Sequence, residues 1–590
     1  MRLPYHPALP GFMRQLGGRY HKEQRSWSVP LTRAFPLPHV LETLYPQAPF
    51  LQEVRGVLRE LGVFSPEDLR QALKRVLDES EFHLLPEQKS DLVRLFLAAE
   101  RALKDPEAPR GFLLACGTGT GKTYVYSAFA SAWSRLGPVL VVVPNEELAR
   151  KVTRVLRGFG GEGVEVTTYG RLGRYRGFSG LLVLDEAHMV KNVVGAKASA
   201  RGKEAKALIA EAPFTLFVSA TPFDRPWEAA YMAPVRPHSL TKDSSFQAFL
   251  ERFGVRFRQR SFGGNEPYFA GTLEDLRSFY RTLTAGGFMT KRLFRPPPGL
   301  VTYEAPKLAL PKEGASLIRE ARKRLKEVSR EALPEERGLV LSFRENLSRA
   351  LLERLKLTAS LPFIHELLEE GWHVALFLAY RQERLLDFST PESVTSFLEA
   401  SRLRGNKGVL APYVVQALSG LTLAMENPME TLRESFAHLG EELAFYTGAQ
   451  SQGELRRALE AWDEGKVRLL VLTQAKGGVG LSLHDTRGGR PTAQVVLTLP
   501  WTAIDLDQVL GRVVRVGLKS PVKVVLPLAP MAVEAKLGAV IAQRLKVLGY
   551  AVRGGELSLP KELLDAFEYG LAHLDPEGME RAVLGEEALV

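Results

Sequence analysis

Short runs of apolar, mostly β-branched residues alternate with helical segments in two separate stretches of this chain. The stretches cover residues 81–225 and 372–530. Apolar runs of strand length between helices are typical of a parallel sheet that is buried on both faces. The predicted strands are 111–115, 139–143, 181–184 and 215–218 in the first stretch and 374–378, 467–472, 493–499 and 522–526 in the second. We therefore predict an α/β fold with two lobes, each built around a parallel sheet.

Smaller regions flank and interrupt these lobes. Residues 1–36 predict a basic α+β module with one short helix and two short strands. Residues 37–80 predict a helical linker, in which Ser65-Pro-Glu-Asp68 supplies an N-cap, a first-turn proline and acids that match the helix dipole. Helices are also predicted between the lobes (226–371), in an insertion within the second lobe (387–440) and in a tail (531–590).

Length and charge narrow the class of protein. A chain of 590 residues is too long for one hydrophobic core. Its net charge of +11 and pI near 9.5 favour a polyanionic partner, because each phosphate that a Lys or Arg neutralises releases a condensed counterion. Basic residues gather within 2–33, where Glu23 is the only acid, and again within 252–260. For the second cluster a solvated surface is an equal alternative.

Neither a membrane segment nor a disulfide is expected. No apolar run is long enough to cross a bilayer, and the first residues lack the apolar region of a signal peptide. The single cysteine, Cys116, has no partner in the chain, which agrees with a reducing compartment. We therefore expect a cytoplasmic protein.

A glycine-rich loop, Cys116-Gly-Thr-Gly-Thr-Gly-Lys-Thr123, follows a predicted strand and should open a helix. Glycines let backbone N–H groups surround phosphate oxygens, while Lys122 reaches the terminal phosphates and Thr123 ligates magnesium. An accidental glycine turn is the alternative. The predicted ATP-binding residues of this loop are Gly117, Thr118, Gly119, Thr120, Gly121, Lys122 and Thr123, with Lys122 also assigned to catalysis.

Two acids follow a later predicted strand, in Leu182-Val-Leu-Asp-Glu-Ala-His188. Phosphoryl transfer needs Mg²⁺ held by one acid and a polarised water that attacks the γ-phosphate. We predict that Asp185 is the metal ligand and that Glu186 activates the water. His188 would couple this site to the hydroxyls of Ser219 and Thr221, which follow the next strand.

The second lobe carries two more candidate segments. If residues 508–517 are helical, Gln508, Arg512 and Arg515 share a face, and both guanidinium groups can serve as arginine fingers at the γ-phosphate. An ordinary basic helix face is the alternative. Upstream, the glycine-rich turn in 472–485 predicts contacts to phosphate through main-chain amides, unless it is only a tight strand-to-helix connection. The candidates there are Thr473 and Lys476 for nucleic acid and Gly480 for ATP.

Taken in chain order, these segments resemble motifs I, Ia, Ib, II, III, V and VI of superfamily-2 helicases, with a DEAH box at 185–188. The resemblance spans most of 81–517 and implies two RecA-like lobes that clamp MgATP and ratchet along nucleic acid. In this family the first position of the glycine loop commonly varies, so Cys116 fits. The resemblance adds three residues: Gln88 as an adenine contact, and Pro144 and Thr168 as nucleic-acid contacts.

Finer resemblances favour DNA. Residues 473–483, 499–503 and 288–293 resemble Swi/Snf-type translocases and, more closely, phage and strawberry-notch-type helicases, which are mostly duplex DNA translocases. Residues 9–31 resemble the HARP module of annealing helicases, and their interleaved basic and aromatic residues suit nucleic acid. A small β module that only packs its tryptophan is the alternative. The predicted contacts are Arg19, Lys22, Arg25 and Trp27.

We therefore expect an ATP-dependent DNA helicase or translocase that uses ATP and Mg²⁺ and has nucleic acid, DNA rather than RNA, as its partner. An RNA helicase and a restriction-enzyme motor subunit are alternatives within the enzymes. A nucleotide-dependent switch or scaffold that binds ATP without moving is a third. Glu186 and Arg512 argue against the switch, because a switch needs no efficient hydrolysis.

Overall fold

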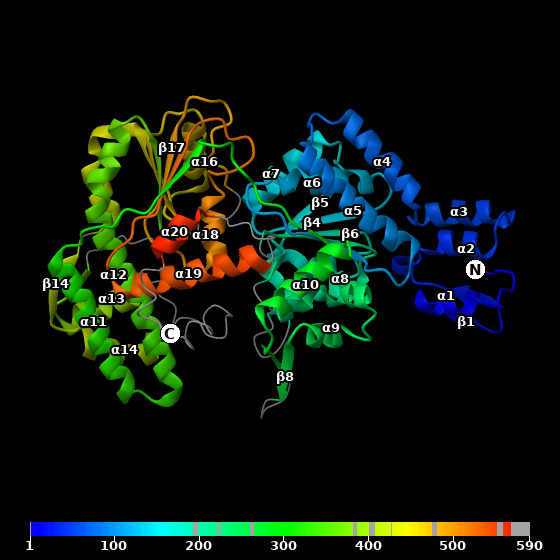
Figure 1. Ribbon diagram of the computed structural model, residues 1–590, viewed down its shortest axis with the longest axis horizontal. Helices are drawn as coiled ribbons and strands as arrows, with labels where there is room; N and C mark the ends of the chain where they lie inside the picture. Colours follow the sequence, from blue (N-terminus) through cyan, green and yellow to red (C-terminus); the bar gives the residue numbers. More distant parts are fainter. Residues whose placement is uncertain are drawn as a thin grey trace. The chain divides into compact units, whose positions relative to one another are not determined.

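The chain folds into two compact units in the computed structural model (Figure 1). The first comprises residues 1–294 and 550–556, and the second comprises 295–549 and 557–590. The structure describes residues 2–191, 193, 199–220, 222–223, 226–259, 265–380, 386–400, 407–425, 427–474, 481–551 and 559–567. Among these residues, no helix has both the length and the apolar character needed to cross a bilayer.

The first unit is built on a six-stranded parallel sheet with the order β10-β3-β7-β6-β4-β5. Its strands are β3 (Gly111–Leu114), β4 (Val139–Val143), β5 (Glu165–Thr168), β6 (Leu181–Asp185), β7 (Thr215–Val218) and β10 (Met289–Thr290). All residues of β3, β4, β6 and β7 are buried, which confirms the strands predicted from continuous apolar runs. Because the strands are parallel, the loops after them meet at one edge of the sheet.

Helices pack against both faces of this sheet. Helix α6 (Lys122–Ser134) packs against α5 (Pro86–Lys104) and α7 (Glu146–Gly158), and α8 (Ala200–Glu211) packs against the short 3₁₀ helices η2 (Tyr169–Tyr175) and η3 (Ala187–Val190). The unit also contains η4 (Pro226–Val235), η5 (Pro237–Thr241), α9 (Phe246–Arg252), α10 (Leu273–Ala285) and the antiparallel pair β8 (Val255–Gln259) and β9 (Asn265–Phe269).

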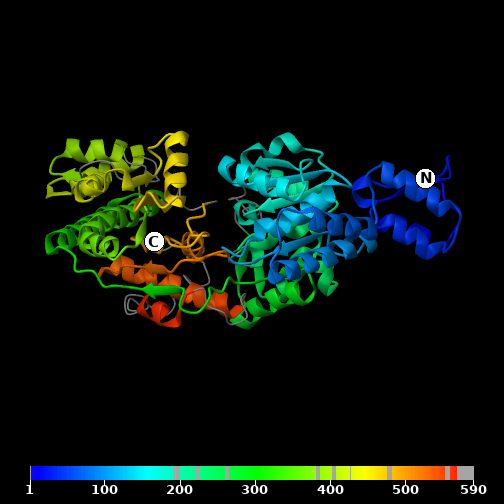
Figure 2. The ribbon, with the colours of Figure 1, turned by 90° about the horizontal axis from the view of Figure 1, so that it is seen from above.

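The N-terminal elements belong to this first unit (Figures 1 and 2). They are α1 (Leu9–Gln15), β1 (Arg19–His21), β2 (Ser26–Ser28), η1 (Leu31–Arg33), α2 (Leu37–Leu44), α3 (Phe50–Glu60) and α4 (Pro66–Glu79). Ser65 is the N-cap of α4, as predicted, and it forms a capping box with Asp68, which donates its N–H to the Ser65 hydroxyl at 3.2 Å and accepts from the Ser65 N–H at 2.9 Å. Leu9, Met13 and Leu16 are buried in the same core as the first sheet, so 1–36 is not packed as a separate module.

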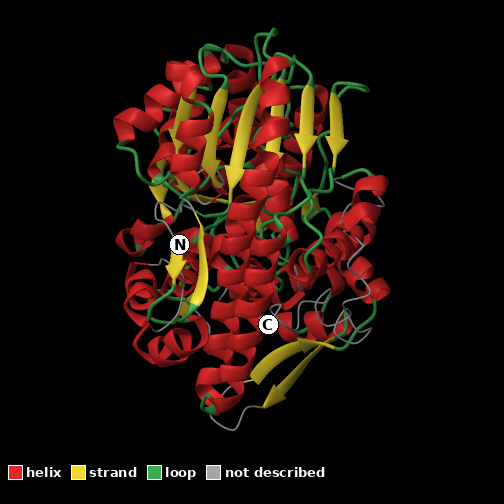
Figure 3. Cartoon of the chain, turned by 90° about the vertical axis from the view of Figure 1, so that its left-hand side faces the viewer, coloured by secondary structure: helices red, strands yellow, loops and turns green. Residues whose placement is uncertain are grey.

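The second unit is built on another six-stranded parallel sheet, with the order β11-β18-β17-β12-β16-β15. Figure 3 shows its strands side by side and pointing the same way. They are β11 (Val301–Glu304), β12 (His373–Leu378), β15 (Leu443–Tyr446), β16 (Leu469–Thr473), β17 (Thr492–Val496) and β18 (Val522–Val525). Two parallel sheets with covering helices confirm the predicted pair of RecA-like lobes.

Helices surround the second sheet, and some of them also form a helical part that has its own hydrophobic core. That core includes Leu325 of α11 and Leu351 of α12. The helices and remaining strands are α11 (Lys312–Glu331), α12 (Pro334–Glu369), β13 (Leu386–Phe388), α13 (Pro391–Ala400), α14 (Lys407–Leu418), β14 (Leu421–Met425), α15 (Pro428–Ser435), η6 (Ala437–Glu442), α16 (Gln452–Asp463), α18 (Ala503–Leu510), α19 (Ala532–Ala551) and α20 (Lys561–Phe567).

Two predicted regions differ from the structure. Residues 226–371 do not form a separate helical region, because β10 joins the first sheet and β11 joins the second, so the division falls near residue 294. The predicted helical insertion 387–440 also holds an antiparallel strand pair, β13 with β14. These strands are too short to produce a clear alternation of apolar and polar residues.

Candidate nucleotide-binding site

The glycine-rich loop lies between β3 and α6, as its sequence predicts. Gly119 and Gly121 have φ angles of 75° and 78°, in the left-handed region that favours glycine. A Cβ on Gly121 would lie 2.3 Å from the Gln88 side chain, so the loop has no room for another residue there. No side chain caps the start of α6, whose first N–H groups therefore suit a phosphate.

Lys122 is the first residue of α6, and its ammonium group lies over the loop. Its Nζ donates to the carbonyl oxygens of Cys116 at 2.9 Å and Gly117 at 3.1 Å. These bonds hold the positive charge at the mouth of the loop, where the terminal phosphates of a nucleotide would lie.

A buried network supports the loop from behind. Gln88 donates from Nε2 to the Thr120 carbonyl at 3.4 Å and accepts from the Leu85 N–H at Oε1. Asp91 accepts from Arg292 at 2.7 Å, and Gly117 donates its N–H to the Arg292 carbonyl at 2.6 Å. The structure thus places Gln88, the predicted adenine contact, beneath the loop with both ends of its amide bonded to main chain.

The two predicted catalytic acids lie at the carboxyl end of β6. The Asp185 carboxylate accepts from the Glu186 N–H at 3.0 Å and from the Tyr126 hydroxyl at 2.9 Å. Burial, together with the neighbouring charge of Glu186, raises the pKa of Asp185 to about 7. Glu186 is in the left-handed region, with φ 53° and ψ 50°, a strained position for a residue with a side chain.

These residues fit a magnesium ion. The Oε2 atom of Glu186 is buried and has no hydrogen-bond partner among the described residues. A divalent cation beside Asp185 would favour its charged form, which burial opposes. The hydroxyl of Thr123 and the carboxylate of Asp185 are oxygen ligands of the kind that Mg²⁺ prefers.

His188 connects the ends of two strands. Its Nδ1 lies 3.0 Å from the Ser219 hydroxyl, just after β7, and 3.4 Å from Oε2 of Glu186. The structure thus brings together the proposed water-activating acid and one of the two hydroxyls predicted for coupling. The other, Thr221, lies outside the described residues.

The second unit holds the predicted arginine fingers on a turn rather than on a helix. The shared face of Gln508, Arg512 and Arg515 required a helix through 508–517, but α18 ends at Leu510. The main chain turns away after Gly511, and the Arg512 carbonyl accepts from the Leu483 N–H at 2.8 Å. Both guanidinium groups still converge, since Arg512 and Arg515 each donate to the Leu481 carbonyl, at 3.3 and 3.0 Å.

Two of the other four candidates of the second unit are described by the structure. Gln508 is buried on α18, and Thr473 is the last, buried residue of β16. Lys476 and Gly480 lie outside the described residues.

The predicted nucleic-acid contacts of the first unit fall in two places. Pro144 follows β4 and Thr168 ends β5, so both lie at the sheet edge that carries the glycine loop. Trp27 is half-buried on the β1–β2 hairpin, with its ring centroid 5.2 Å from that of Tyr20. The other three predicted contacts, Arg19, Lys22 and Arg25, are exposed on the same hairpin.

Sequence reasoning missed Tyr126, Tyr169, Asp91 and Arg292. The signal for Tyr126 was present, because it lies three residues after Thr123 and therefore on the same face of α6. No local signal marks Arg292, since it meets Asp91 across a sequence separation of 201 residues.

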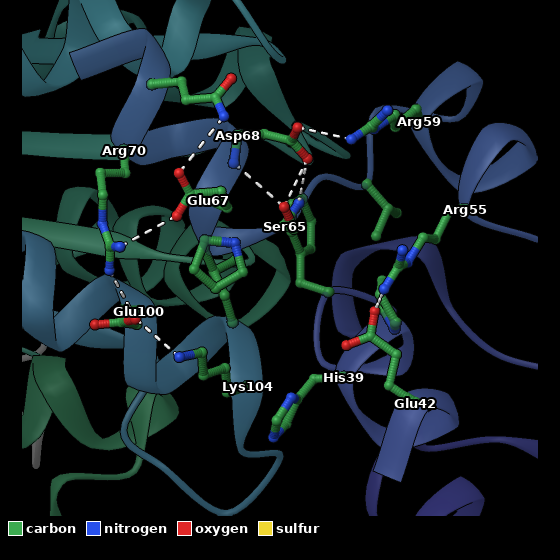
Figure 4. Close-up of a pocket in the computed structure, with 16 residues that line it drawn as sticks. His39, Glu42, Arg55, Arg59, Ser65, Glu67, Asp68, Arg70, Glu100 and Lys104 are labelled. Atoms are coloured by element: carbon green, nitrogen blue, oxygen red, sulfur yellow. Dashed lines mark hydrogen bonds and ion pairs between the residues drawn. The ribbon is translucent and has the colours of Figure 1, made fainter. Parts of the chain in front are cut away.

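A separate pocket of about 480 Å³ lies among α2, α3, α4 and α5 (Figure 4). The arginines in this pocket have carboxylate partners, so they do not form a cation cluster suited to a phosphate. The pairs are Arg55 with Glu42, Arg59 with Asp68 and Arg70 with Glu100.

Three comparisons relate the chain to known proteins. Residues 70–172 match the family model of the type III restriction enzyme res subunit. A segment of 75 residues is 39% identical to a protein of Acanthamoeba polyphaga mimivirus named as an ATP-dependent RNA helicase. That segment covers 13% of this chain and 14% of the viral protein. Among solved structures, the Sulfolobus solfataricus SWI2/SNF2 ATPase core in complex with dsDNA matches at 16% identity and a TM-score of 0.31, over 86% of this chain and 97% of that chain.

Proposed function

We propose that this chain is a motor of helicase superfamily 2, which hydrolyses ATP to move along nucleic acid, with DNA as its track. The observation that carries the proposal is the arrangement at one edge of the first sheet. There, the loop with Lys122 and the acids Asp185 and Glu186 follow parallel strands, and a buried oxygen of Glu186 has no hydrogen-bond partner among the described residues.

The residues of the first unit take distinct roles in this proposal. Backbone N–H groups of Gly117–Gly121 and the ammonium of Lys122 bind the phosphates. Thr123 and Asp185 hold Mg²⁺, which supplies neutralisation of phosphate charge when it is bound. Glu186 accepts a proton from the attacking water, and its Oε2, lying 3.4 Å from His188, is the atom that takes it.

The second unit contributes Arg512 and Arg515. We assign both guanidinium groups to the charge that develops on the transferred phosphoryl group, a role worth about 10³–10⁵ in rate. Gln508, on the helix just before them, is assigned to coupling between hydrolysis and movement. Thr473 is assigned to the nucleic-acid backbone, as are Pro144 and Thr168 of the first unit.

DNA is proposed as the track on two grounds. The segments 288–293, 473–483 and 499–503 resemble those of proteins that are mostly duplex DNA translocases. The β1–β2 hairpin also exposes Arg19, Lys22 and Arg25 beside the Tyr20–Trp27 pair, a combination that suits a phosphate backbone and stacked bases. The viral relative is named as an RNA helicase, so RNA is the second candidate track.

A row of arginines on α7 supports a polyanionic partner. Arg150, Arg154 and Arg157 are exposed at a spacing of four and three residues, so they share one face of the helix. None of them has an ion pair among the described residues. Like charges at this spacing destabilise a helix by about 0.2–0.5 kcal/mol per pair, a cost that a bound phosphate backbone offsets.

Steady-state ATP hydrolysis tests the proposal. We expect stimulation by duplex DNA that exceeds stimulation by single-stranded DNA and by RNA, that fades as salt rises, and that is absent in Lys122→Ala. Stronger stimulation by RNA would transfer the assignment to an RNA helicase. An ATP hydrolysis rate that none of the three nucleic acids changes would contradict the proposed motor function and favour a nucleotide-dependent switch.

A further inference from the structure

Tyr126 contacts Asp185, one of the two side chains that we assign to magnesium. It is one turn beyond Lys122 and Thr123 on α6, and it is fully buried. Its hydroxyl donates to Oδ2 of Asp185 at 2.9 Å. One phenol thus links the helix that follows the glycine loop to the acid that follows β6.

Asp185 is fixed from three directions. Tyr126 donates to one carboxylate oxygen, and the Glu186 N–H donates to the other at 3.0 Å. The hydroxyl of Tyr169, from η2, donates to the Asp185 main-chain carbonyl at 2.7 Å. With both carboxylate oxygens and the carbonyl bonded, neither the side chain nor the peptide of Asp185 is free to rotate.

A buried tyrosine hydroxyl needs a partner in any fold, so a purely structural role has to be weighed. Two other buried tyrosines of the first unit show what that role looks like. Tyr231 donates to the Pro222 carbonyl at 3.2 Å, and Tyr280 donates to the Phe223 carbonyl at 3.0 Å. Both therefore satisfy main-chain groups, whereas Tyr126 donates to the carboxylate of Asp185, a side chain of the candidate metal site.

We propose that Tyr126 is a positioning residue that holds Asp185 in the orientation that binds the divalent cation of the nucleotide. This inference rests on the proposed ATP site. Hydrogen bonds from a protein group to a metal ligand orient that ligand before the metal arrives, and their loss typically costs about 10- to 100-fold in metal affinity. Tyr126 would therefore set the concentration of Mg²⁺ that the protein needs.

The test uses the full chain with Tyr126→Phe, which removes the hydroxyl and keeps the ring. Binding of a fluorescent ADP analogue is titrated with Mg²⁺ at equilibrium, so that the readout does not depend on turnover. We expect the Mg²⁺ midpoint to rise about tenfold, while binding of the analogue without Mg²⁺ stays at the wild-type value. Tyr280→Phe, which loses a buried hydroxyl bonded to a carbonyl, is the matched control and should keep the wild-type midpoint.

Each other outcome is decisive. A Tyr126→Phe midpoint equal to that of the wild type overturns the positioning role while leaving the ATP site intact. Equal weakening of binding with and without Mg²⁺, together with a lower melting temperature, also overturns it, because that result describes a structural tyrosine. If the wild type itself shows no Mg²⁺-dependent binding of the analogue, the proposed function fails rather than the role of Tyr126 alone.

Discussion

Arg292 and Asp91 form an ion pair beneath the glycine loop, with 2.7 Å between Nη2 of the arginine and Oδ2 of the aspartate. Asp91 is 3% exposed and also accepts from the Thr290 hydroxyl, while Arg292 reaches the Thr120 carbonyl at 3.4 Å. Residues just after the last strand of the first sheet therefore hold the loop from behind. The loop is therefore supported by a residue that follows Thr120 by 172 positions.

Replacing Arg292 with Ala should destabilise the first unit and weaken nucleotide binding together. The change leaves the Asp91 carboxylate buried without its cation, which typically costs about 3–5 kcal/mol in unfolding free energy. Urea denaturation and equilibrium binding of ATP measure the two effects. Arg70→Ala, which breaks exposed pairs with Glu67 and Glu100, should cost less than about 1 kcal/mol. Similar losses for the two variants would contradict a supporting role for the buried pair.

Replacing Glu186 with Gln should separate binding from turnover. The amide keeps the size of the side chain but accepts no proton, so hydrolysis is expected to fall by about 10²–10⁴ while the dissociation constant for ATP changes little. Single-turnover hydrolysis and equilibrium binding, measured on the same preparation, give both quantities. Normal turnover in this variant would mean that another group activates the water.

Removing the arginine row of α7 should weaken DNA binding and reduce its dependence on salt concentration. The variant replaces Arg150, Arg154 and Arg157 with Ala, and each lost phosphate contact reduces the slope of log K against log salt by about 1. Fluorescence anisotropy with duplex DNA at several salt concentrations measures the slope. ATP hydrolysis without DNA should stay at the wild-type rate.

A control with the same change in net charge is available on α11 of the second unit. Arg319, Lys323 and Lys326 are exposed at the same four- and three-residue spacing. If their replacement by Ala changes the slope as much as the α7 variant does, the effect reflects total charge and not a DNA-binding face on α7.

The sequence pattern predicts buried strands well and edge strands poorly. Strands β4 and β7 occupy the predicted residues because each is a continuous apolar run covered on both faces. In contrast, β5 at the edge of the sheet reads Glu-Val-Thr-Thr and is partly exposed, while β10 has only two residues. Neither β5 nor β10 has a recognisable pattern of apolar residues. Because β10 cannot be recognised in this way, the prediction ends the first lobe at residue 225.

The residues of the candidate site also differ in how well the sequence predicts them. Motif residues such as Lys122, Asp185 and Glu186 are readable because local spacing fixes the chemistry. The groups that orient them come from distant segments, as Tyr126 does for Asp185 across 59 positions. Contacts of that kind depend on strand order, which neither composition nor periodicity encodes. The end of α18 was missed for a related reason, since the turn after Gly511 depends on a bond to Leu483.

Asp485 should make the stability of the second unit depend on pH in the acid range. Burial raises the pKa of this carboxylate, but hydrogen bonds from the Ser520 hydroxyl and from the main-chain N–H groups of Arg487, Arg490 and Gly488 outweigh it and lower the pKa to about 2. The folded pKa is thus below the ordinary value of 3.8. The stabilisation is therefore fully present above pH 4 and is lost as the pH falls toward 2.

Asp485→Asn should consequently lower the unfolding free energy at pH 7 by about 2 kcal/mol, and the difference from the wild type should shrink as the pH falls from 4 toward 2. Urea denaturation of both proteins at a series of pH values measures this difference. Glu441→Gln, at an exposed position of η6, provides the control and should leave unfolding close to the wild type at every pH. A difference between Asp485→Asn and the wild type that stays constant down to pH 2 would show that the asparagine disturbs packing, because only a titrating carboxylate loses its contribution in acid.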